Sequence, residues 1–409
     1  MSIWKQLRQE EILRLHGVTV PPPGTFKLQS RQHDIPLTSP PQDSWTQFFT
    51  FNLLQEECAR APRQNVFLSP LSVFLGLSMI ENGASGQVKI AMRRVLGLPL
   101  DATESAVNEF AAGLLNNFRS NGKAEFSIAN ALWADLDSAF VPEFVENCEK
   151  VYGATAQALD FRQPSAATTI NQWISEKTQG HISEMIAPSA LAKLSAILAN
   201  AIYFKGIFVE RFPPDFTRLK KFQLADGQSK RVQMMMNGGL ANSYRCGEGF
   251  EVAIRRYENT DVALCMILPA QGKMPQDVLT EDVIHALFKP DEGFQLCLEM
   301  PKFTVNFNAS LRASLSRLGM GIAFEYPDAD FSSLATPDFV LSESVHKTRL
   351  EVDEDGTVAL AAIYNYGAAG AACAPPVPTK TLIFNRPFAV LLLNTKTRTV
   401  VFGGVVYDP

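Results

Sequence analysis

The chain has 409 residues, of which 46% are hydrophobic and 19% are charged, so it can bury a large core and is too apolar to remain unfolded. Its 37 Lys and Arg residues against 42 Asp and Glu residues give a formal net charge of -5, which provides no general attraction to nucleic acid or to an anionic membrane surface. These values exclude an intrinsically disordered protein and argue against polyanion binding.

The sequence shows no pattern for crossing a membrane. Its longest apolar stretches, 196–204 and 387–393, are much shorter than the ~20 residues that a helix needs to span a bilayer. Charged side chains interrupt residues 1–17, which therefore lack the apolar segment of a secretory signal and predict a cytoplasmic protein or a leaderless export route. The six cysteines have no Cys-x-x-Cys spacing, which favours free thiols over a disulfide framework or a zinc site.

Residues 1–42 differ in pattern from the rest of the chain. A short amphipathic helix is indicated by apolar residues spaced along the first 15 positions, and a Pro-rich stretch follows it. We therefore predict an N-terminal extension over 1–42 and a main domain over 43–409.

Helical patterns dominate the first half of the main domain. Ser69 is suited to cap a helix whose first position is Pro70, directly after a short strand-like run at 65–68. This helix is expected to continue to about Asn82, where Gly83 would end it in the left-handed conformation. Further helices are predicted at 104–117, 142–152 and 166–178, and strands at 126–133 and 196–204.

Strand patterns dominate after residue 220. Alternating apolar residues predict strands at 251–257, 262–268, 294–300, 345–352, 389–393 and 399–406. Because no internal repeat and no linker composition interrupts the chain after residue 43, we predict one large α+β domain.

The sequence motifs do not support a catalytic or cofactor site. The five histidines are isolated from one another, and no paired Cys/His spacing would hold a metal. No phosphate-binding loop or complete dinucleotide fingerprint is present. Ser85 lacks the Gly-x-Ser-x-Gly context of a nucleophile and is more typical of a turn that ends a helix. We therefore predict that the protein is not an enzyme and needs no metal or cofactor.

A basic cluster lies between residues 211 and 231. Glu210, Asp215 and Asp226 are interleaved with its cations, and only a surface of one sign concentrates a polyanion. We interpret the cluster as an ordinary solvated face and expect no nucleic-acid partner. Its members are Arg211, Arg218, Lys220, Lys221, Lys230 and Arg231.

One long segment does not fit ordinary surface structure. Residues 356–379 carry no charge and are framed by the acidic run 351–355 and by Lys380. Long loops of this kind are usually functional, with a flexible Ala/Gly linker as the alternative. Residues 357–374 contain no proline, so every amide could donate to a sheet ladder, and most side chains are small enough to slide between existing strands. The segment predicts a strand that is added to a sheet.

At this point the chain resembles the serpin family over nearly its whole length, from about residue 44 to Pro409. Each motif alone is weak, but the motifs together keep the order and spacing of that family. The resemblance implies an α+β serpin fold with three mixed sheets, about eight or nine helices and an exposed reactive loop at 356–379. The motifs are Asn65–Ser72, Gly83–Gly86, Leu198–Gly206, Met300–Phe303, Leu318–Met320, His346–Lys347, Glu354–Thr357, Phe384–Phe388, Phe402–Val406 and Pro409.

Serpins are suicide inhibitors of proteases, and the resemblance implies that activity for this chain. In the family, the protease attacks the loop as a substrate, and the acylated loop inserts into the main sheet before the ester is hydrolysed. The implied partner is a serine protease, with a cysteine protease as an alternative. The implied state is a monomer that forms loop-sheet polymers on heating. The bulky Val358, Leu360 and Ile363 leave a second hypothesis, a non-inhibitory serpin that acts as a binding or chaperone-like protein.

The resemblance also assigns residues to the insertion step. The hinge, where small residues ease insertion, comprises Glu354, Gly356, Thr357, Ala359, Ala361 and Ala362. The shutter, a polar cluster beneath the strands that must part, comprises Ser69, Ser72, Asn200 and His346. In the breach at the top of the sheet, Phe208 stands where the family usually has tryptophan.

The reactive bond is placed by counting along the loop. Counting as in the family gives Gly370-Ala371, although the long loop leaves any bond from Tyr366 to Cys373 open. Small residues over 367–374 favour an elastase-like or subtilisin-like protease, whereas cleavage after Tyr366 would suit a chymotrypsin-like protease.

Overall fold

The computed structural model describes residues 45–118, 124–241, 243–290, 293–336, 339–357 and 378–409. The chain divides into two units, residues 1–39 and 40–409, and every described residue belongs to the second unit. The predicted N-terminal extension at 1–42 therefore lies outside the described residues, as does the predicted loop from 358 to 377.

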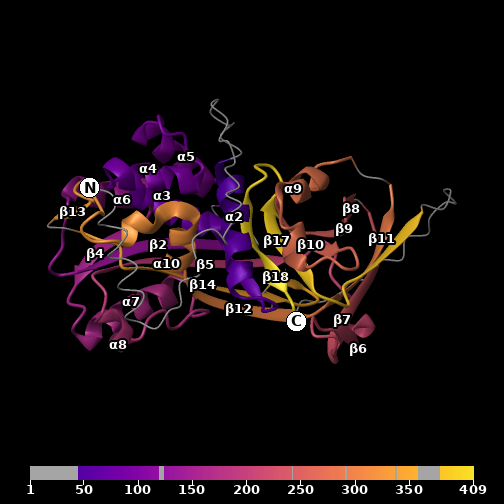
Figure 1. The fold of residues 1–409 in the computed structure, drawn as a ribbon. Helices are drawn as coiled ribbons and strands as arrows, with labels where there is room; N and C mark the ends of the chain where they lie inside the picture. The colour runs from indigo at the N-terminus through magenta and orange to yellow at the C-terminus, as the bar shows by residue number, and fades with distance from the viewer. Residues whose placement is uncertain (1–44, 119–123, 242, 291–292, 337–338, 358–377) are drawn as a thin grey trace, which may run out of the picture. The chain divides into compact units, whose positions relative to one another are not determined.

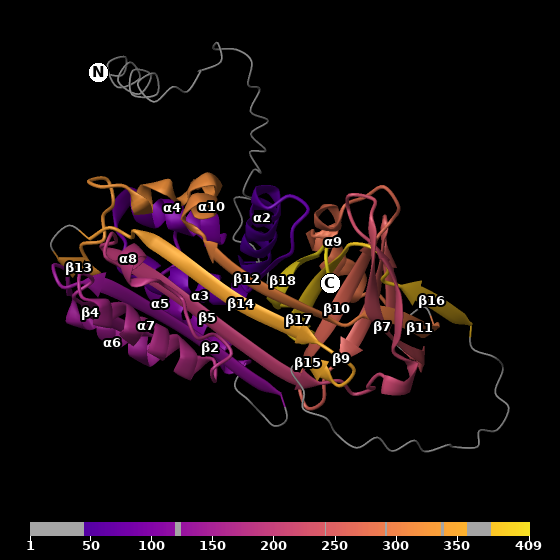
Figure 2. The ribbon, with the colours of Figure 1, turned by 90° about the horizontal axis from the view of Figure 1, so that it is seen from below.

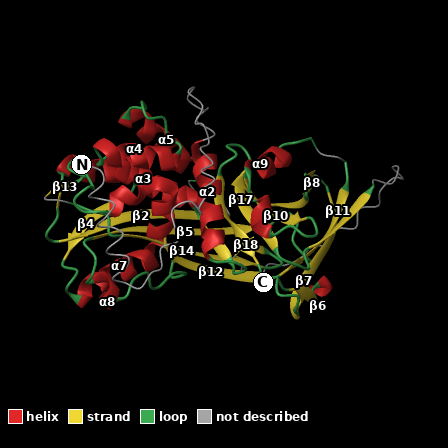
Figure 3. Ribbon diagram, in the orientation of Figure 1, coloured by secondary structure: helices red, strands yellow, loops and turns green. Residues whose placement is uncertain are grey.

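The described α-helices are α2 (Trp45–Arg60), α3 (Pro70–Glu81), α4 (Gly86–Leu96), α5 (Glu104–Asn116), α6 (Pro142–Tyr152), α7 (Pro164–Lys177), α8 (Pro188–Leu191), α9 (Glu281–Leu287) and α10 (Arg312–Leu315). In Figure 1, α3, α4, α5 and α6 lie on one side of a central sheet, and α7 and α8 lie on the other side. Figure 3 shows the same layers with helices and strands in separate colours. Helices therefore cover both faces of this sheet.

The central sheet has six strands in the order β12-β14-β15-β5-β2-β4, and Figure 2 shows the long strands side by side. Because successive side chains of a strand point to opposite faces, Leu198 and Ile202 enter a large core, whereas Ile197 and Ala199 pack in a second core with Ile170 of α7. The strands are β2 (Glu125–Asp135), β4 (Thr155–Leu159), β5 (Ala196–Ile207), β12 (Phe303–Ser310), β14 (Glu343–Val352) and β15 (Gly356–Thr357).

A second six-stranded sheet has the order β1-β18-β17-β10-β9-β8 and is antiparallel throughout. Its strands are buried on both faces over most of their length, as the apolar runs at 262–268 and 389–393 predict. The strands are β1 (Val66–Leu68), β8 (Tyr244–Gly247), β9 (Phe250–Arg256), β10 (Val262–Pro269), β17 (Phe388–Asn394) and β18 (Val400–Val406).

A four-stranded sheet has the order β16-β11-β7-β6, with one parallel pair, β16 and β11. Its strands are β6 (Arg218–Gln223), β7 (Ser229–Leu240), β11 (Gln295–Pro301) and β16 (Thr379–Ile383), and a short ribbon joins β3 (Ala139–Phe140) to β13 (Ala335–Thr336). The predicted α+β class with three principal sheets is confirmed for the described residues, two of the sheets being mixed and one antiparallel.

The start of α3 is confirmed and its predicted end is wrong in one respect. Ser69 caps the helix by accepting the N–H of Ser72, and Pro70 is its first residue. The cap residue Asn82 is right-handed, with φ -60°, and Gly83 does not adopt the left-handed conformation. A Cβ at Gly83 would lie 2.3 Å from Cβ of Leu334, so this glycine is required by close packing rather than by the cap.

Candidate functional site

The central sheet has an incomplete ladder between β5 and β14. These strands pair in parallel only where Ile197–Ala201 faces Glu343–Lys347. Beyond this point, residues 202–205 pair only with β2, and residues 348–351 pair only with β12, among the residues that the structure describes. We call the facing edges of 202–205 and 348–351 the open ladder. Because these two edges do not pair with each other, one more strand could form hydrogen bonds with both of them.

The short strand β15 closes the open ladder at one end. Thr357 is paired with Val352 of β14 and with Gly206 of β5. Gly356 has φ 153°, and a Cβ on it would lie 2.1 Å from the carbonyl oxygen of Gly206, so only glycine fits there. Thr357 is fully buried, and its hydroxyl lies 2.6 Å from the hydroxyl of Tyr257. Two residues of the predicted hinge, Gly356 and Thr357, therefore already form a short strand in the central sheet.

A tight turn brings the chain from β14 into β15. The Asp353 carboxylate accepts the N–H groups of Asp355 and Gly356, although burial raises its pKa. Glu354 Oε2 lies 2.6 Å from Lys302 Nζ, and its Oε1 accepts the hydroxyl of Thr217. Burial alone would raise the pKa of Glu354, but hydrogen bonds from Lys302 and Thr217 outweigh it and lower the pKa. The turn is thus fixed by charge as well as by backbone geometry.

The lowered pKa of Glu354 predicts an acid-sensitive hinge. A carboxylate whose pKa is lower in the folded state stabilises the fold above its ordinary pKa, and this contribution is lost as pH falls through the folded value. We expect Glu354→Gln to melt below the parent protein at pH 7 and the two melting temperatures to converge below about pH 4. Thermal melting from pH 7 to pH 3 checks this expectation. Parallel curves for the two proteins would contradict it.

The residues that follow β5 hold the turn through their backbone. Phe208 is fully buried, and its N–H donates to the carbonyl of Asp355 at 2.8 Å. The N–H of Phe212 donates to the carbonyl of Glu354 at 2.9 Å. The Phe208 ring also stacks on Tyr257, with 4.9 Å between ring centroids. The predicted breach residue therefore touches both the hinge turn and the tyrosine that binds Thr357.

Beneath the paired end of β5 and β14 lies a buried polar cluster. The Ser69 hydroxyl donates to the Val401 carbonyl, and the Ser69 N–H donates to His346 Nε2 at 2.9 Å. Because Nε2 accepts, the imidazole proton is on Nδ1. Burial lowers the pKa of His346 to about 3, so this histidine is neutral at physiological pH.

Asn130 of β2 joins the remaining predicted shutter residues. Its side-chain oxygen accepts the Ser72 hydroxyl at 3.3 Å and Asn200 Nδ2 at 2.7 Å. Gly76 makes room for this arrangement, because a Cβ there would lie 2.4 Å from Asn200 Nδ2. The cluster links α3 to two strands of the central sheet, β2 and β5.

Removal of the Asn130 acceptor should destabilise the intact protein. Asn130→Ala leaves the Ser72 hydroxyl and an Asn200 N–H buried without their partner, which costs about 2–4 kcal/mol. We expect a melting temperature about 3–5 °C lower. Asn306→Ala, at an exposed position on β12 of the same sheet, is the matched control. Equal melting of both variants would show that the cluster adds no stability.

The structure brings most of the predicted site residues together. It places Glu354, Gly356 and Thr357 at the end of the open ladder next to Phe208, and the four shutter residues in one buried cluster. The remaining hinge residues Ala359, Ala361 and Ala362, and the predicted reactive bond Gly370-Ala371, lie outside the described residues. Sequence reasoning did not assign Asn130, Tyr257 or Lys302 to the site.

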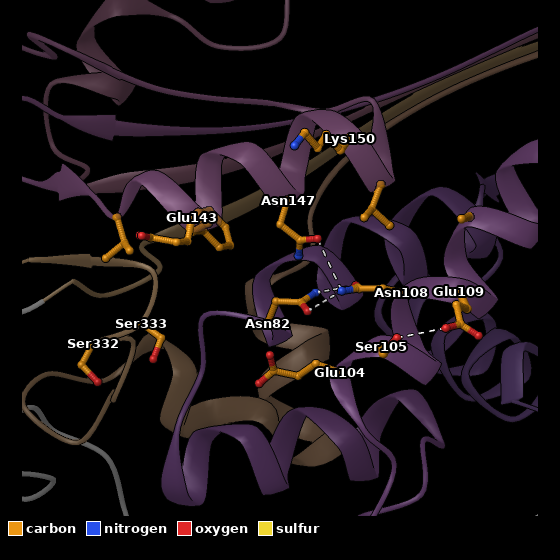
Figure 4. A pocket seen from close by; sticks show the side chains of 14 residues that line it. Asn82, Glu104, Ser105, Asn108, Glu109, Glu143, Asn147, Lys150, Ser332 and Ser333 are labelled. Atoms are coloured by element: carbon orange, nitrogen blue, oxygen red, sulfur yellow. Dashed lines mark hydrogen bonds between the residues drawn. The ribbon is translucent and has the colours of Figure 1, made fainter.

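A cavity of about 850 Å³ lies apart from these residues, between α5 and α6 (Figure 4). Its amides largely bind one another: Asn82 and Asn108 exchange two hydrogen bonds of 3.0 Å, and Asn108 also donates to Asn147. Within the described residues, no group of three or more His, Cys, Asp or Glu side chains could hold a metal ion. No described helix is long and apolar enough to span a bilayer.

Three of the six cations in the predicted basic cluster form separate ion pairs. Lys220 binds both carboxylate oxygens of Glu299 at 2.8 Å. Lys230 pairs with Asp408, and Arg211 lies within 3.7 Å of Asp355. This mixed charge supports the interpretation of a solvated face rather than of a polyanion site.

Comparisons with known proteins agree on one family. A sequence model described as "Serpin (serine protease inhibitor)" matches residues 44–409. Human antithrombin-III is 30% identical over 358 residues, which cover 84% of this chain and 76% of that protein. The native structure of the thermophilic serpin tengpin superimposes with a TM-score of 0.81 at 25% identity and covers 90% of this chain and 94% of its own. The structure of human thyroxine-binding globulin shares the fold, with a TM-score of 0.79 at 24% identity. The match covers 90% of this chain and 98% of that chain.

Proposed function

The chain belongs to the serpin family, and we propose that it inhibits a serine-type endopeptidase as a suicide substrate. The observation that carries this proposal is the docking of Gly356 and Thr357 between β5 and β14 at the end of the open ladder. A strand already begun at this place needs only to be continued. Members of the family are generally inhibitors rather than catalysts, and we propose an inhibitory role without enzyme activity here.

The proposed reaction uses the protease's own chemistry. The nucleophilic serine of the protease attacks a loop carbonyl, an ester forms, and the peptide bond breaks with release of the new amino terminus. The loop that stays attached to Thr357 then inserts before water hydrolyses the ester. Residues 357–370 would span about 46 Å at roughly 3.3 Å per residue, which is enough to carry the protease along the length of the sheet.

The alternation of side chains supports insertion of this sequence. Thr357 faces Tyr257 and the large core, so Ala359 and Ala361 would follow it on that face of the new strand. Val358 and Leu360 would point to the opposite face. The small residues would therefore face the large core, to which β5 and β14 also contribute buried side chains. Ile363 is the first bulky residue of the loop that would face this core.

We propose a target with a shallow specificity pocket. Small residues surround the proposed reactive bond Gly370-Ala371, and elastase-like or subtilisin-like proteases accept such residues. A cysteine protease remains an alternative target, because it also forms an acyl intermediate that insertion could trap. We further propose a monomeric inhibitor that forms loop-sheet polymers when heated.

The test is a search for covalent complexes. The protein is incubated with elastase-like, subtilisin-like, chymotrypsin-like and papain-like proteases, and the products are separated in denaturing detergent. We expect a band near the mass of the protease plus the 45.1 kDa of this chain, less the C-terminal fragment that loop cleavage separates from it. Protease whose nucleophile is replaced by alanine is the control and should give no such band. Loop cleavage without a complex for every protease would contradict the proposal.

A non-inhibitory binding or chaperone-like role is the second candidate. It is favoured by Val358, Leu360 and Ile363, which are larger than the residues that usually enter the sheet in this family. Under this hypothesis the loop is cleaved but never inserts. Cleaved protein that melts at the temperature of the intact protein would favour it.

A further inference from the structure

Arg255 is a buried charge beside the hinge. It lies on β9 next to Arg256, and because neighbouring residues of a strand point to opposite faces, one of these arginines must enter the interior. Arg256 is exposed, and the side chain of Arg255 is completely buried. None of its three nitrogens has a hydrogen-bond partner among the described residues. Buried arginines are normally paired, so this one requires an explanation.

The guanidinium of Arg255 is surrounded by one short segment, residues 208–212. Its central carbon lies 5.3 Å from the ring centroid of Phe208 and 5.0 Å from that of Phe212. Its only ion-pair partner among the described residues is Glu210, at 3.6 Å, and the Glu210 side chain is half exposed. Two aromatic faces and one distant carboxylate offset part of the cost of burying the charge.

The remaining cost of burying Arg255 lowers the pKa of its guanidinium. Burial lowers its pKa to about 10, and Glu210 and Tyr257 raise it only in part. A lowered pKa of a cation means that the folded surroundings disfavour the charge, so the intact protein is destabilised at neutral pH. Replacement of such an ion by an apolar side chain of similar volume is often stabilising.

The segment 208–212 lies beside the hinge turn, next to the docked residues Gly356 and Thr357. It continues β5, and the N–H of Val209 donates to the carbonyl of Arg256 at 2.9 Å. The N–H groups of Phe208 and Phe212 hold the hinge turn. Continuation of β15 along the open ladder would part residues 197–201 of β5 from residues 343–347 of β14, and the resulting shift of β5 would carry this segment relative to β9. That shift would admit water to the guanidinium and relieve its unmet hydrogen bonds.

We propose that the buried guanidinium of Arg255 destabilises the end of the central sheet next to the hinge turn and thereby speeds insertion of the loop. The proposal rests on the proposed inhibitory function and deepens it by naming a residue that sets the insertion rate. Arg255 does not touch the reactive bond, so it acts on insertion and not on attack by the protease. The rate of loop attack is therefore independent of this side chain.

Two substitutions with opposite effects test the proposal. Arg255→Met keeps the length of the side chain and removes the charge, so it should raise the melting temperature of the intact protein and slow insertion about tenfold. Glu210→Gln removes the offsetting carboxylate, so it should lower the melting temperature and speed insertion. In the background of Arg255→Met, Glu210→Gln should have no effect. Arg218→Met, an exposed arginine on β6, is the matched control and should behave like the parent.

Insertion is measured in the intact protein without a protease. A fluorescent synthetic peptide with the sequence of residues 357–370 is added, and its uptake into the sheet is followed by the change in anisotropy. Where a target protease is found, the ratio of trapped to cleaved inhibitor should fall in Arg255→Met while the rate of initial attack stays constant. Arg255→Lys retains a cation and should restore the parent ratio.

The outcomes separate this proposal from the proposed function. If Arg255→Met melts below the parent or takes up the peptide as fast, the proposal for Arg255 is overturned, whatever the protein inhibits. If the parent protein takes up no peptide and forms no complex, the inhibitory function fails, and the melting temperatures of Arg255→Met and Glu210→Gln still decide whether the guanidinium strains the sheet. Should Arg255→Met not fold, a lower melting temperature of Glu210→Gln supports the proposal and an unchanged one refutes it.

Discussion

Cleavage of the loop between Ile363 and Ala374 should raise the melting temperature by about 20 °C or more. The intact sheet lacks a ladder between 202–205 and 348–351, and a cut loop can supply it by extending β15. The new strand would pair on both sides and bury side chains against the cores on the two faces of the sheet. Limited digestion with a non-specific protease, followed by calorimetry of intact and cut protein, measures the change.

The control for this experiment is a loop that can be cut but cannot insert. Cut Thr357→Arg protein should melt close to intact Thr357→Arg protein, because a charge at a fully buried position prevents the loop from extending β15. An equal rise in both proteins would mean that cleavage stabilises the fold by another route. No rise in the parent protein would favour the binding-protein hypothesis.

Thr357→Arg should also convert the protein from an inhibitor into a substrate. Thr357 has no exposed surface, and its hydroxyl is held by Tyr257 at 2.6 Å. A guanidinium placed there would lie in the large core without a partner, so insertion would become slower than hydrolysis of the ester. We expect at least about tenfold fewer covalent complexes per loop cleaved. Densitometry of complex and cleaved inhibitor after one round of reaction gives this ratio.

Thr357→Ser is the matched variant. It keeps the small size and the hydroxyl that reaches Tyr257, so it should form complexes in the same proportion as the parent protein. A loss of complexes in Thr357→Ser as large as that in Thr357→Arg would show that the threonine methyl group, and not burial of a charge, decides the outcome.

Elements with clear end signals were predictable from the sequence. The helix at 142–152 agrees with α6 at both ends, because Pro142 begins it and Gly153 ends it with φ 57°. Central strands such as β10 and β17 were predictable for a related reason, since burial on both faces produces an unbroken apolar run. Local chemistry alone is enough in these cases.

Elements whose pattern depends on their neighbours were missed. Strand β6 forms the edge of its sheet and is almost wholly exposed, so its sequence Arg-Leu-Lys-Lys-Phe-Gln shows no apolar alternation. Helix α4 was not predicted from the sequence, although Val88, Met92 and Val95 lie on one buried face with helical spacing.

The residues of the candidate site that belong to sequence motifs were predictable, and the others were not. Hinge and shutter residues lie in recognisable motifs, whereas Asn130 interrupts the apolar run 128–134 of β2 and Arg255 directly follows the apolar run 252–254 of β9. A polar residue in such a run is itself a signal, because it must find a buried partner. Which partner it finds depends on strands that are distant in sequence, and no local pattern encodes that.

The two ends of the loop are anchored in different sheets. Thr357 belongs to the central sheet, whereas Pro378 accepts the N–H of Gln295 and Thr379 starts β16 of the four-stranded sheet. Natural selection can therefore act on the two halves of the loop separately. Under the proposed inhibitory function, substitutions near Thr357 are constrained by the fit inside the protein, whereas substitutions near the proposed reactive bond are constrained by the target protease. Under that proposal, substitutions near the reactive bond could change the target while the residues that insert are inherited unchanged.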